Sequence, residues 1–311
     1  MLKFIAWRIA QLPLILAVIY LITFLLVWVA PGSPFGNPER KLDPAAEKSL
    51  REQFHAESIP QFLGYYPWRL LHGDLGPSMN YHGWSVNDVL RYSLPVSLAL
   101  GLVGMFIAIV GGCALGVTAA LRKGGIMDFF SMALALVGIS VPSFVVAALL
   151  LRVFGDWLHW LPTGGWGTVR QMILPGVALS LLPMAYIVRL TRTSMLDNLG
   201  QDFVRTARAK GLGRQTVIWK HAFRNAFLPV FTYLGPATAY TITGSFVVET
   251  IFNIPGLGQH FVNGVKNRDQ TLILGTVLVF ALVLLVLNLL VDIGYAFIDP
   301  RIDVAEKQGS A

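Results

Sequence analysis

The sequence predicts an all-α, polytopic membrane protein: a helical bundle of about six transmembrane helices, with a periplasmic loop containing short helices and a cytoplasmic helical hairpin. Three observations predict this fold class. Only 13% of the 311 residues are charged while 55% are hydrophobic, whereas soluble domains carry roughly a quarter charged residues. The apolar residues form long blocks instead of short periodic stripes. The basic residues concentrate in a few connections, as they do in membrane proteins.

Composition also narrows the classes of function. Cys113 is the single cysteine, so disulfides within the chain and cysteine-based zinc sites are excluded. The net charge of +7 is interpreted as the basic bias of cytoplasmic loops and not as a nucleic-acid surface. We expect no metal and no cofactor on this chain.

The six apolar blocks are each long enough to cross a hydrocarbon core of roughly 30 Å. Within a helix every backbone donor finds an acceptor, which the bilayer interior requires. We expect them to belong to one transmembrane domain over residues 1–311. The predicted spans are Ile9–Ala30, Leu94–Leu121, Phe129–Phe154, Met172–Leu190, Leu228–Val248 and Leu272–Ile298.

The first block has a second interpretation, as a cleaved secretion signal, because Lys3 and Arg8 precede it. It is longer than the roughly 7–15 apolar residues of such signals, and it ends in Ala30-Pro31-Gly32 without an A-x-A cleavage pattern. We therefore expect a retained helix.

Charge asymmetry orients the spans in the membrane. The loop 31–93 balances its basic and acidic residues, and we predict that it is periplasmic. The loop 191–227 is strongly basic, and we predict that it is cytoplasmic, together with both termini. In the outer loop, Asp43-Pro44 predicts the start of a short helix, and Ser85 with Asp88 resembles a capping box before the second span.

The basic loop predicts a pair of helices. The first runs from Phe203 to Lys210 with Asp202 as its N-cap, and Gly211 ends it in the left-handed conformation. The second runs from Arg214 toward Phe227. An ordinary solvated loop on the positive-inside face is the alternative interpretation, and DNA binding is disfavoured because membrane spans tether both ends.

Two runs in this loop resemble a known family. Residues 205–211 read RTARAKG and residues 221–229 read HAFRNAFLP, which is similar to the peptide and nickel branch of binding-protein-dependent ATP-binding cassette importers. The wider family's Glu-Ala-Ala opening is absent. Further matches along the chain resemble the B-type transmembrane subunit of oligopeptide permeases: Ala30-Pro31-Gly32-Ser33-Pro34, Gly73-Asp74-Leu75-Gly76, Gly244-Ser245 through Glu249, Pro255-Gly256-Leu257-Gly258, Arg268-Asp269 and Asp299-Pro300-Arg301.

The resemblance implies four kinds of partner: a second homologous permease, two ATP-binding subunits, a periplasmic solute-binding protein and the lipid bilayer. ATP and Mg²⁺ would then bind the partner subunits, and this chain has no G-x-x-x-x-G-K-[ST] pattern of its own. The chain itself is not expected to be an enzyme. Residues expected to couple ATP hydrolysis to transport are Arg205, Ala207, Arg208, Lys210, Gly211, Arg214, His221 and Arg224, and those expected to meet the binding protein are Pro255, Gly256, Leu257 and Gly258.

Three residues are candidates for lining the path or gate. Glu249 lies at the outer end of the fifth predicted span, where a carboxylate faces either the interface or a watery path. Pro142 and Pro183 interrupt apolar spans, which kinks a helix or serves close packing. Peptides, with oligopeptides favoured, are the expected cargo. The alternatives are a nickel or other small-solute importer of the same family, or a self-sufficient secondary transporter, although neither paired broken helices nor charged midplane sites are evident in the sequence.

Overall fold

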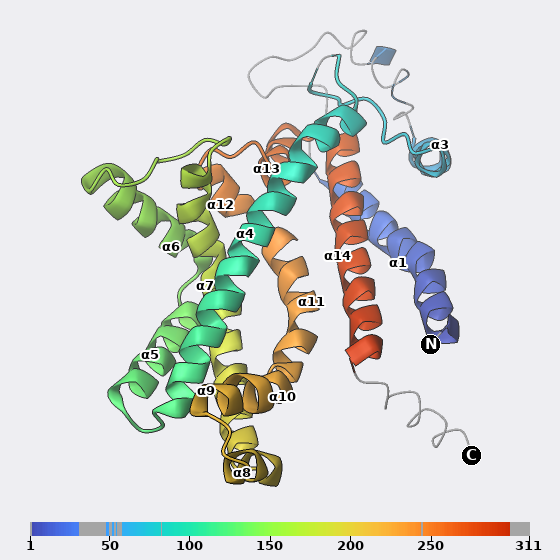
Figure 1. The fold of residues 1–311 in the computed structure, drawn as a ribbon. Helices are drawn as coiled ribbons and strands as arrows, with labels where there is room; N and C mark the ends of the chain where they lie inside the picture. Colours follow the sequence, from blue (N-terminus) through green and yellow to red (C-terminus); the bar gives the residue numbers. More distant parts are fainter. Residues whose placement is uncertain are drawn as a thin grey trace. The chain divides into compact units, whose positions relative to one another are not determined.

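The computed structural model describes residues 2–30, 48–49, 52, 54, 58–81, 83–243 and 245–298. Within these ranges the regular structure is helical, apart from one isolated β-bridge between Pro77 and Ser85 (Figure 1). The helices are α1 (Leu2–Val29), α3 (Ile59–Leu71), α4 (Val86–Leu121), α5 (Ile126–Ser140), α6 (Ser143–Leu150), the π-helix η1 (Leu151–Trp157), α7 (Val169–Leu199), α8 (Asp202–Ala209), α9 (Arg214–Thr216), the π-helix η2 (Val217–Phe223), α10 (Arg224–Ala226), α11 (Leu228–Thr243), α12 (Phe246–Ile251), α13 (Leu257–Asn267) and α14 (Gln270–Ile298).

The chain forms two compact units. The first, called the central unit here, comprises Met1–Ile5, Leu98–Ile254 and Leu284–Ala311. The second, called the outer unit, comprises Ala6–Ser97 and Pro255–Val283. The single domain predicted for residues 1–311 stays a prediction, and each unit is described by itself.

The helical membrane fold is confirmed. Four helices are long and apolar enough to cross a bilayer, over Ala6–Val29, Val86–Leu121, Val169–Leu199 and Gln270–Val291. A fifth candidate is the bent pair Ile126–Ser140 and Ser143–Trp157, whose axes differ by 108°.

Two predicted spans therefore do not form single straight helices. The span Phe129–Phe154 breaks between α5 and α6, because Pro142 has no N–H to continue the α5 hydrogen-bond ladder. The span Leu228–Val248 divides into α11, which has 16 residues, and the short α12. At 1.5 Å per residue α11 rises about 24 Å, which is less than the core thickness of about 30 Å.

In the central unit, α7 packs against α5, α6 and α11. The N-terminus of α7 is fixed by a capping box, in which the backbone N–H of Thr168 donates to the side-chain carbonyl of Gln171 at 3.0 Å. α4 approaches α7 very closely. A Cβ placed on Gly116 would lie 2.6 Å from Cβ of Thr191 and 2.9 Å from the Val188 carbonyl oxygen, so only glycine permits this separation of the two backbones.

The outer unit is held by a stack of aromatic rings. Phe62 and Tyr66 of α3 stack with their ring centroids 5.3 Å apart, and Tyr66 in turn stacks on Tyr20 of α1 at 5.9 Å. Leu274 and Leu278 of α14 complete this buried cluster. Burial raises the pKa of the Tyr66 hydroxyl above its usual range, because the charged form loses its hydration.

A buried carboxylate joins two distant segments of the outer unit. Asp269 is fully buried and accepts hydrogen bonds from the Ser78 hydroxyl, the Asn80 N–H at 3.1 Å and the Leu272 N–H at 3.0 Å. It also accepts one from the Thr271 hydroxyl at 3.0 Å. These donors replace the hydration of the carboxylate and fix the loop before α4 to the start of α14.

The structure describes only part of the outer loop 31–93, so some of the features predicted there can be compared with it. The capping box is confirmed, since Ser85 N–H donates to the Asp88 carboxylate and Asp88 N–H donates to the Ser85 hydroxyl, both at 3.1 Å. The helix α3 supplies one short helix in this loop. The helix expected to begin at Asp43-Pro44 lies outside the described residues.

The close approach of α4 and α7 yields a stability prediction. Gly116→Ala places a methyl group against Thr191 and should lower the free energy of unfolding by about 1–3 kcal/mol. Gly64→Ala is the matched control, because no atom lies within 4 Å of the new Cβ in α3, and it should be neutral or stabilising by up to about 1 kcal/mol. Thermal unfolding of the detergent-purified protein measures both, and equal effects of the two variants would contradict the close contact.

Candidate functional site

The basic hairpin, defined as residues 202–226, has the predicted first helix and turn, and its second half comprises α9, the π-helix η2 and α10. α8 ends at Ala209, and Gly211 then adopts φ +76°, the left-handed conformation expected of it. The predicted N-cap is wrong: Gln201 occupies that position, and Asp202 is the first residue of the helix. An acidic residue in the first turn still interacts favourably with the helix dipole, and Asp202 also forms an exposed 3.5 Å ion pair with Arg205.

One face of the basic hairpin is apolar and buried. Val204 and Ala207 of α8 pack with side chains of the second half of the hairpin, with Val117 and Ala120 of α4, and with Met195 of α7. The partners from the second half are Val217, Ile218, Ala222 and Ala226. The hairpin is therefore packed against the ends of α4 and α7 and is not a free loop.

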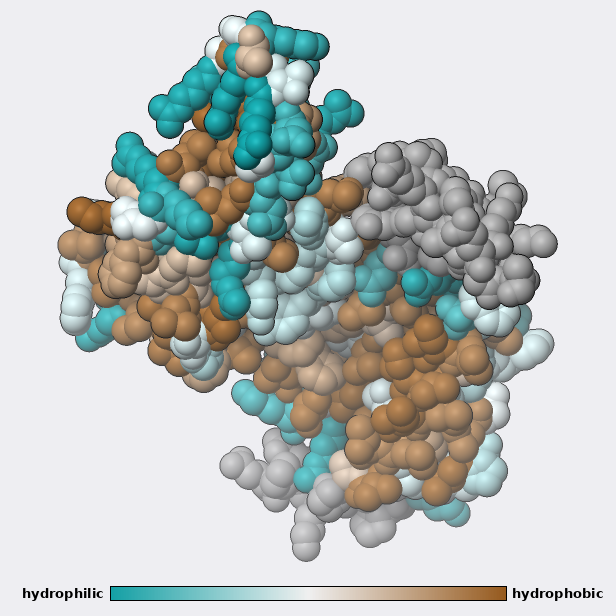
Figure 2. All heavy atoms as spheres, turned by 90° about the horizontal axis from the view of Figure 1, so that it is seen from below, coloured by the Kyte–Doolittle hydropathy of each residue, from teal (hydrophilic) through white to brown (hydrophobic). Residues whose placement is uncertain are grey.

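The opposite face is basic and open. Most of the predicted coupling residues lie exposed on it: Arg205, Arg208, Lys210, Gly211, Arg214 and Arg224. The two exceptions are Ala207, which is buried in the apolar face, and His221, which is half-buried. Seen from the end at which α8 lies in Figure 1, hydrophilic side chains gather on this part of the surface (Figure 2).

A hollow of about 450 Å³ opens beside α8. Its apolar wall includes Leu121 of α4 and Leu199 of α7, and Arg208 and Arg214 also line it. The lining of this hollow therefore mixes two cations with apolar side chains.

A largely buried ion pair lies in the same unit. The Nε and Nη2 atoms of Arg192, on α7, approach the two carboxylate oxygens of Asp128 at 2.5 and 2.7 Å. Asp128 also accepts the Gly124 N–H at 2.9 Å. This bidentate contact joins the first turn of α5 to the last third of α7, because planar guanidinium and carboxylate groups match each other's geometry.

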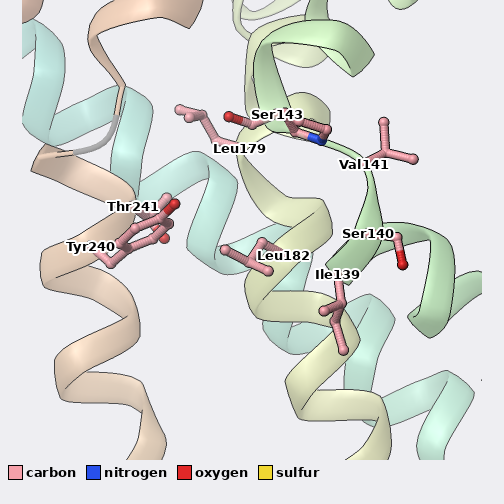
Figure 3. A pocket seen from close by; sticks show the side chains of 9 residues that line it. Ile139, Ser140, Val141, Ser143, Leu179, Leu182, Tyr240 and Thr241 are labelled. Atoms are coloured by element: carbon pink, nitrogen blue, oxygen red, sulfur yellow. The ribbon is translucent and has the colours of Figure 1, made fainter.

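The break between α5 and α6 borders a second hollow, of about 190 Å³. Leu179 and Leu182 of α7 lie between this break and Tyr240 and Thr241 of α11 (Figure 3). The break itself contributes five residues to the lining: Ile139, Ser140, Val141, Pro142 and Ser143.

Both candidate prolines affect the peptide groups near this hollow. Pro142, which is exposed, offers no N–H to the Gly138 carbonyl, and Pro183 offers none to the Leu179 carbonyl, because a proline nitrogen carries no hydrogen. Pro183 is buried inside α7, which continues through it. Irregular backbone at membrane depth is tolerated where it lines a cavity or is buried in protein.

The remaining candidates lie elsewhere. Glu249 is fully buried and accepts a 2.5 Å hydrogen bond from the Ser245 hydroxyl, and it does not line the hollow at the break; its predicted role in the path stays a prediction. Of the four residues predicted to meet the binding protein, Pro255 is the one that is exposed. Gly256, Leu257 and Gly258 are buried, and the Leu257 N–H donates to the Ser97 hydroxyl at 2.8 Å, so these three residues support the turn from inside.

Sequence reasoning missed the Asp128–Arg192 pair and the α7 and α11 lining of the hollow. The pair joins residues 64 positions apart, and nothing in the local pattern marks them as partners. Within the described residues, no group of three His, Cys, Asp or Glu side chains is placed to hold a metal ion.

The ion pair gives a matched comparison of stability. Arg192→Gln leaves the carboxylate of Asp128, whose side chain is 7% exposed, without its strongest donor and should destabilise the protein by about 1–3 kcal/mol. Arg205→Gln breaks an exposed pair and should change stability by less than about 0.5 kcal/mol. Denaturation of the purified protein tests this difference, and Asp128→Asn combined with Arg192→Gln should cost less than the sum of the two single changes.

Comparison with known proteins supports this arrangement. Residues 112–304 match the model of the binding-protein-dependent transport system inner membrane component family. The oligopeptide transport system permease protein OppB of Escherichia coli (strain K12) is 47% identical over 306 residues, covering 97% of this chain and 99% of that protein. The dipeptide transport system permease protein DppB of Bacillus subtilis (strain 168) is 44% identical, covering 93% of this chain and 94% of that protein.

A solved structure shows the same fold. An inward-facing form of the MetNI methionine ABC transporter superposes with a TM-score of 0.53 at 18% identity, covering 68% of this chain and 94% of that one. The described helices, the matched family model and the near full-length relatives agree. The chain belongs to the binding-protein-dependent transport system inner membrane components, in the group of the oligopeptide and dipeptide permease proteins.

Proposed function

We propose that this chain forms, with a second homologous permease, the inward translocation path for peptides, oligopeptides in particular. Two separate ATP-binding subunits supply the energy, and a periplasmic solute-binding protein delivers the cargo. The observation that carries the proposal is the basic hairpin, whose apolar face is fixed to α4 and α7 while its basic face is open, in a chain closely similar to peptide permeases.

The helix α7 connects the hairpin to the hollow at the helix break. Met195 of α7 packs against the hairpin, and Leu179 and Leu182 of the same helix line the hollow. Residues 179 and 195 are about 24 Å apart along a helix at 1.5 Å per residue. A movement of the ATP-binding subunits at the hairpin therefore reaches the hollow through one continuous helix.

The chemistry of the hollow suits a peptide cargo. Its lining combines apolar side chains with the hydroxyl groups of Ser143 and Tyr240 and with peptide groups at the helix break. Peptides of any sequence share main-chain N–H and C=O groups, which such a lining can bind without selecting side chains. Nickel or another small solute is the alternative cargo, and cargo binding by the cognate solute-binding protein distinguishes the two.

The surface for the binding protein is proposed on the outer unit. The loop before α4 is joined there to the segment 255–271, because the Asn80 amide donates to the Asn267 carbonyl at 3.0 Å and the Thr271 hydroxyl donates to the Pro77 carbonyl at 2.7 Å. Tyr81 and His260 add a 3.3 Å contact between the same two segments. Two connections that are far apart in the sequence therefore provide one firm surface, on which Pro255 is exposed.

Energy coupling is tested at Gly211. Gly211 has φ +76°, and no atom lies within 4 Å of a new Cβ at this position. Gly211→Val therefore acts through backbone strain alone, which costs about 1–2 kcal/mol. Reconstituted with the full complex in proteoliposomes, this variant should keep membrane insertion and cargo binding by the binding protein, and lose cargo-stimulated ATP hydrolysis and uptake of a labelled oligopeptide.

Gly213→Val is the matched control for this experiment. Gly213 has φ −58° and also has open space around it, so valine fits there without strain. Wild-type uptake in both variants would refute the coupling role of the hairpin. The wild-type complex could instead accumulate no peptide although its binding protein carries one. That result would refute the peptide cargo.

Orientation is tested by cysteine accessibility. The native Cys113 is buried, so it gives little background with a membrane-impermeant maleimide. In intact spheroplasts, Lys266→Cys in α13 should react at once, whereas Lys123→Cys should react only after permeabilisation, since both side chains are exposed. The reverse pattern would place the basic hairpin outside and contradict the proposed function.

A further inference from the structure

A third hollow lies in the outer unit, between α1, α13 and α14. Its volume is about 340 Å³. The lining is almost wholly apolar and includes Leu26 and Val27 of α1, Phe261 and Val265 of α13, and Ile273 and Val277 of α14. We call it the α1–α14 groove.

The groove lies at the ends of two candidate membrane spans. Its α1 residues belong to the last two turns of the candidate span Ala6–Val29, and its α14 residues belong to the first turns of the candidate span Gln270–Val291. The apolar surface continues out of the groove, since Leu26 is 68% exposed and Val265 is 51% exposed. α1 is nevertheless held in place, because Tyr20 and Phe24 are buried in the aromatic cluster with α3 and α14.

A cation stands at the edge of this apolar groove. Arg268 lines it and ends α13 with φ +59°, a left-handed conformation that is uncommon for a residue other than glycine. No acidic side chain among the described residues forms an ion pair with Arg268. The adjacent Asp269 does not neutralise it, because this carboxylate is fully buried and already accepts the hydrogen bonds of Ser78, Asn80, Thr271 and Leu272.

We propose that the α1–α14 groove binds an anionic phospholipid of the bilayer. One acyl chain lies against the apolar wall, and the headgroup phosphate meets the guanidinium of Arg268, with the Gln270 amide as a second donor at the same end of the groove. A guanidinium binds phosphate in a bidentate geometry, and an apolar channel that leads from it into the membrane matches the shape of a lipid. In the proposed orientation this lipid comes from the outer leaflet.

The experiment uses the full complex in nanodiscs of equal parts phosphatidylglycerol and phosphatidylcholine, followed by native mass spectrometry of the retained lipids. The wild type should retain phosphatidylglycerol in preference to phosphatidylcholine. Arg268→Asn removes the charge while keeping a residue that tolerates the left-handed conformation, and it should lower this preference roughly tenfold. Val265→Trp fills the groove from an exposed position and should lower retention of both lipids.

Arg170→Gln is the matched control, because Arg170 is an exposed cation in the first turn of the candidate span of α7 and does not line the groove. It should retain phosphatidylglycerol as the wild type does. An unchanged preference in Arg268→Asn would overturn the proposal. Cross-linking of the Val265→Cys variant to the second permease, with no lipid retained by the wild type, would overturn it too and assign the groove to a subunit interface.

Discussion

Inside the hydrocarbon core of a bilayer no water is present to bond the N–H and C=O groups of the backbone, and each unsatisfied group costs several kcal/mol. This constraint explains why the described chain is helical and why its long helices run without interruption through most of their length. It also makes the helix break at residues 141 and 142 an exception that needs support from its surroundings. The hollow beside that break is lined in part by hydroxyl groups, so the irregular peptide groups of the break face a cavity instead of lipid. Pro183, inside α7, likewise leaves a carbonyl without its N–H donor close to this hollow.

The second organising feature is contact between small residues. Glycines of α4 let α7 approach it, and the apolar side of the basic hairpin continues the same contact beyond the ends of these helices. Close-packed interfaces of this kind do not deform continuously, so they transmit displacement well. The Asp128–Arg192 pair adds a directional link from α7 to α5. The hairpin, α4, α5 and α7 are thus joined by packing and by one ion pair.

Much of the fold was predictable because its causes are local. Apolar length identified the long helices, the Ser85–Asp88 capping box marked the start of α4, and the left-handed Gly211 marked the end of α8. What the sequence could not provide depends on contacts between distant segments. Whether Pro142 kinks or breaks a helix depends on what surrounds it, and the burial of Gly256, Leu257 and Gly258 depends on packing against other helices. The partners of Asp269 and Asp128 likewise come from other elements.

The composition of the outer unit has a consequence for biosynthesis. This unit is assembled from Ala6–Ser97 and Pro255–Val283, so its two parts leave the ribosome with more than half of the chain between them. Tyr20, Phe62 and Tyr66 can meet early, but Leu274 and Leu278, which close their cluster, are made late. The carboxylate of Asp269 is equally late, and Ser78 has no such acceptor until it arrives. The first membrane helix must therefore be inserted, and kept from aggregation, before its final partners in this unit exist.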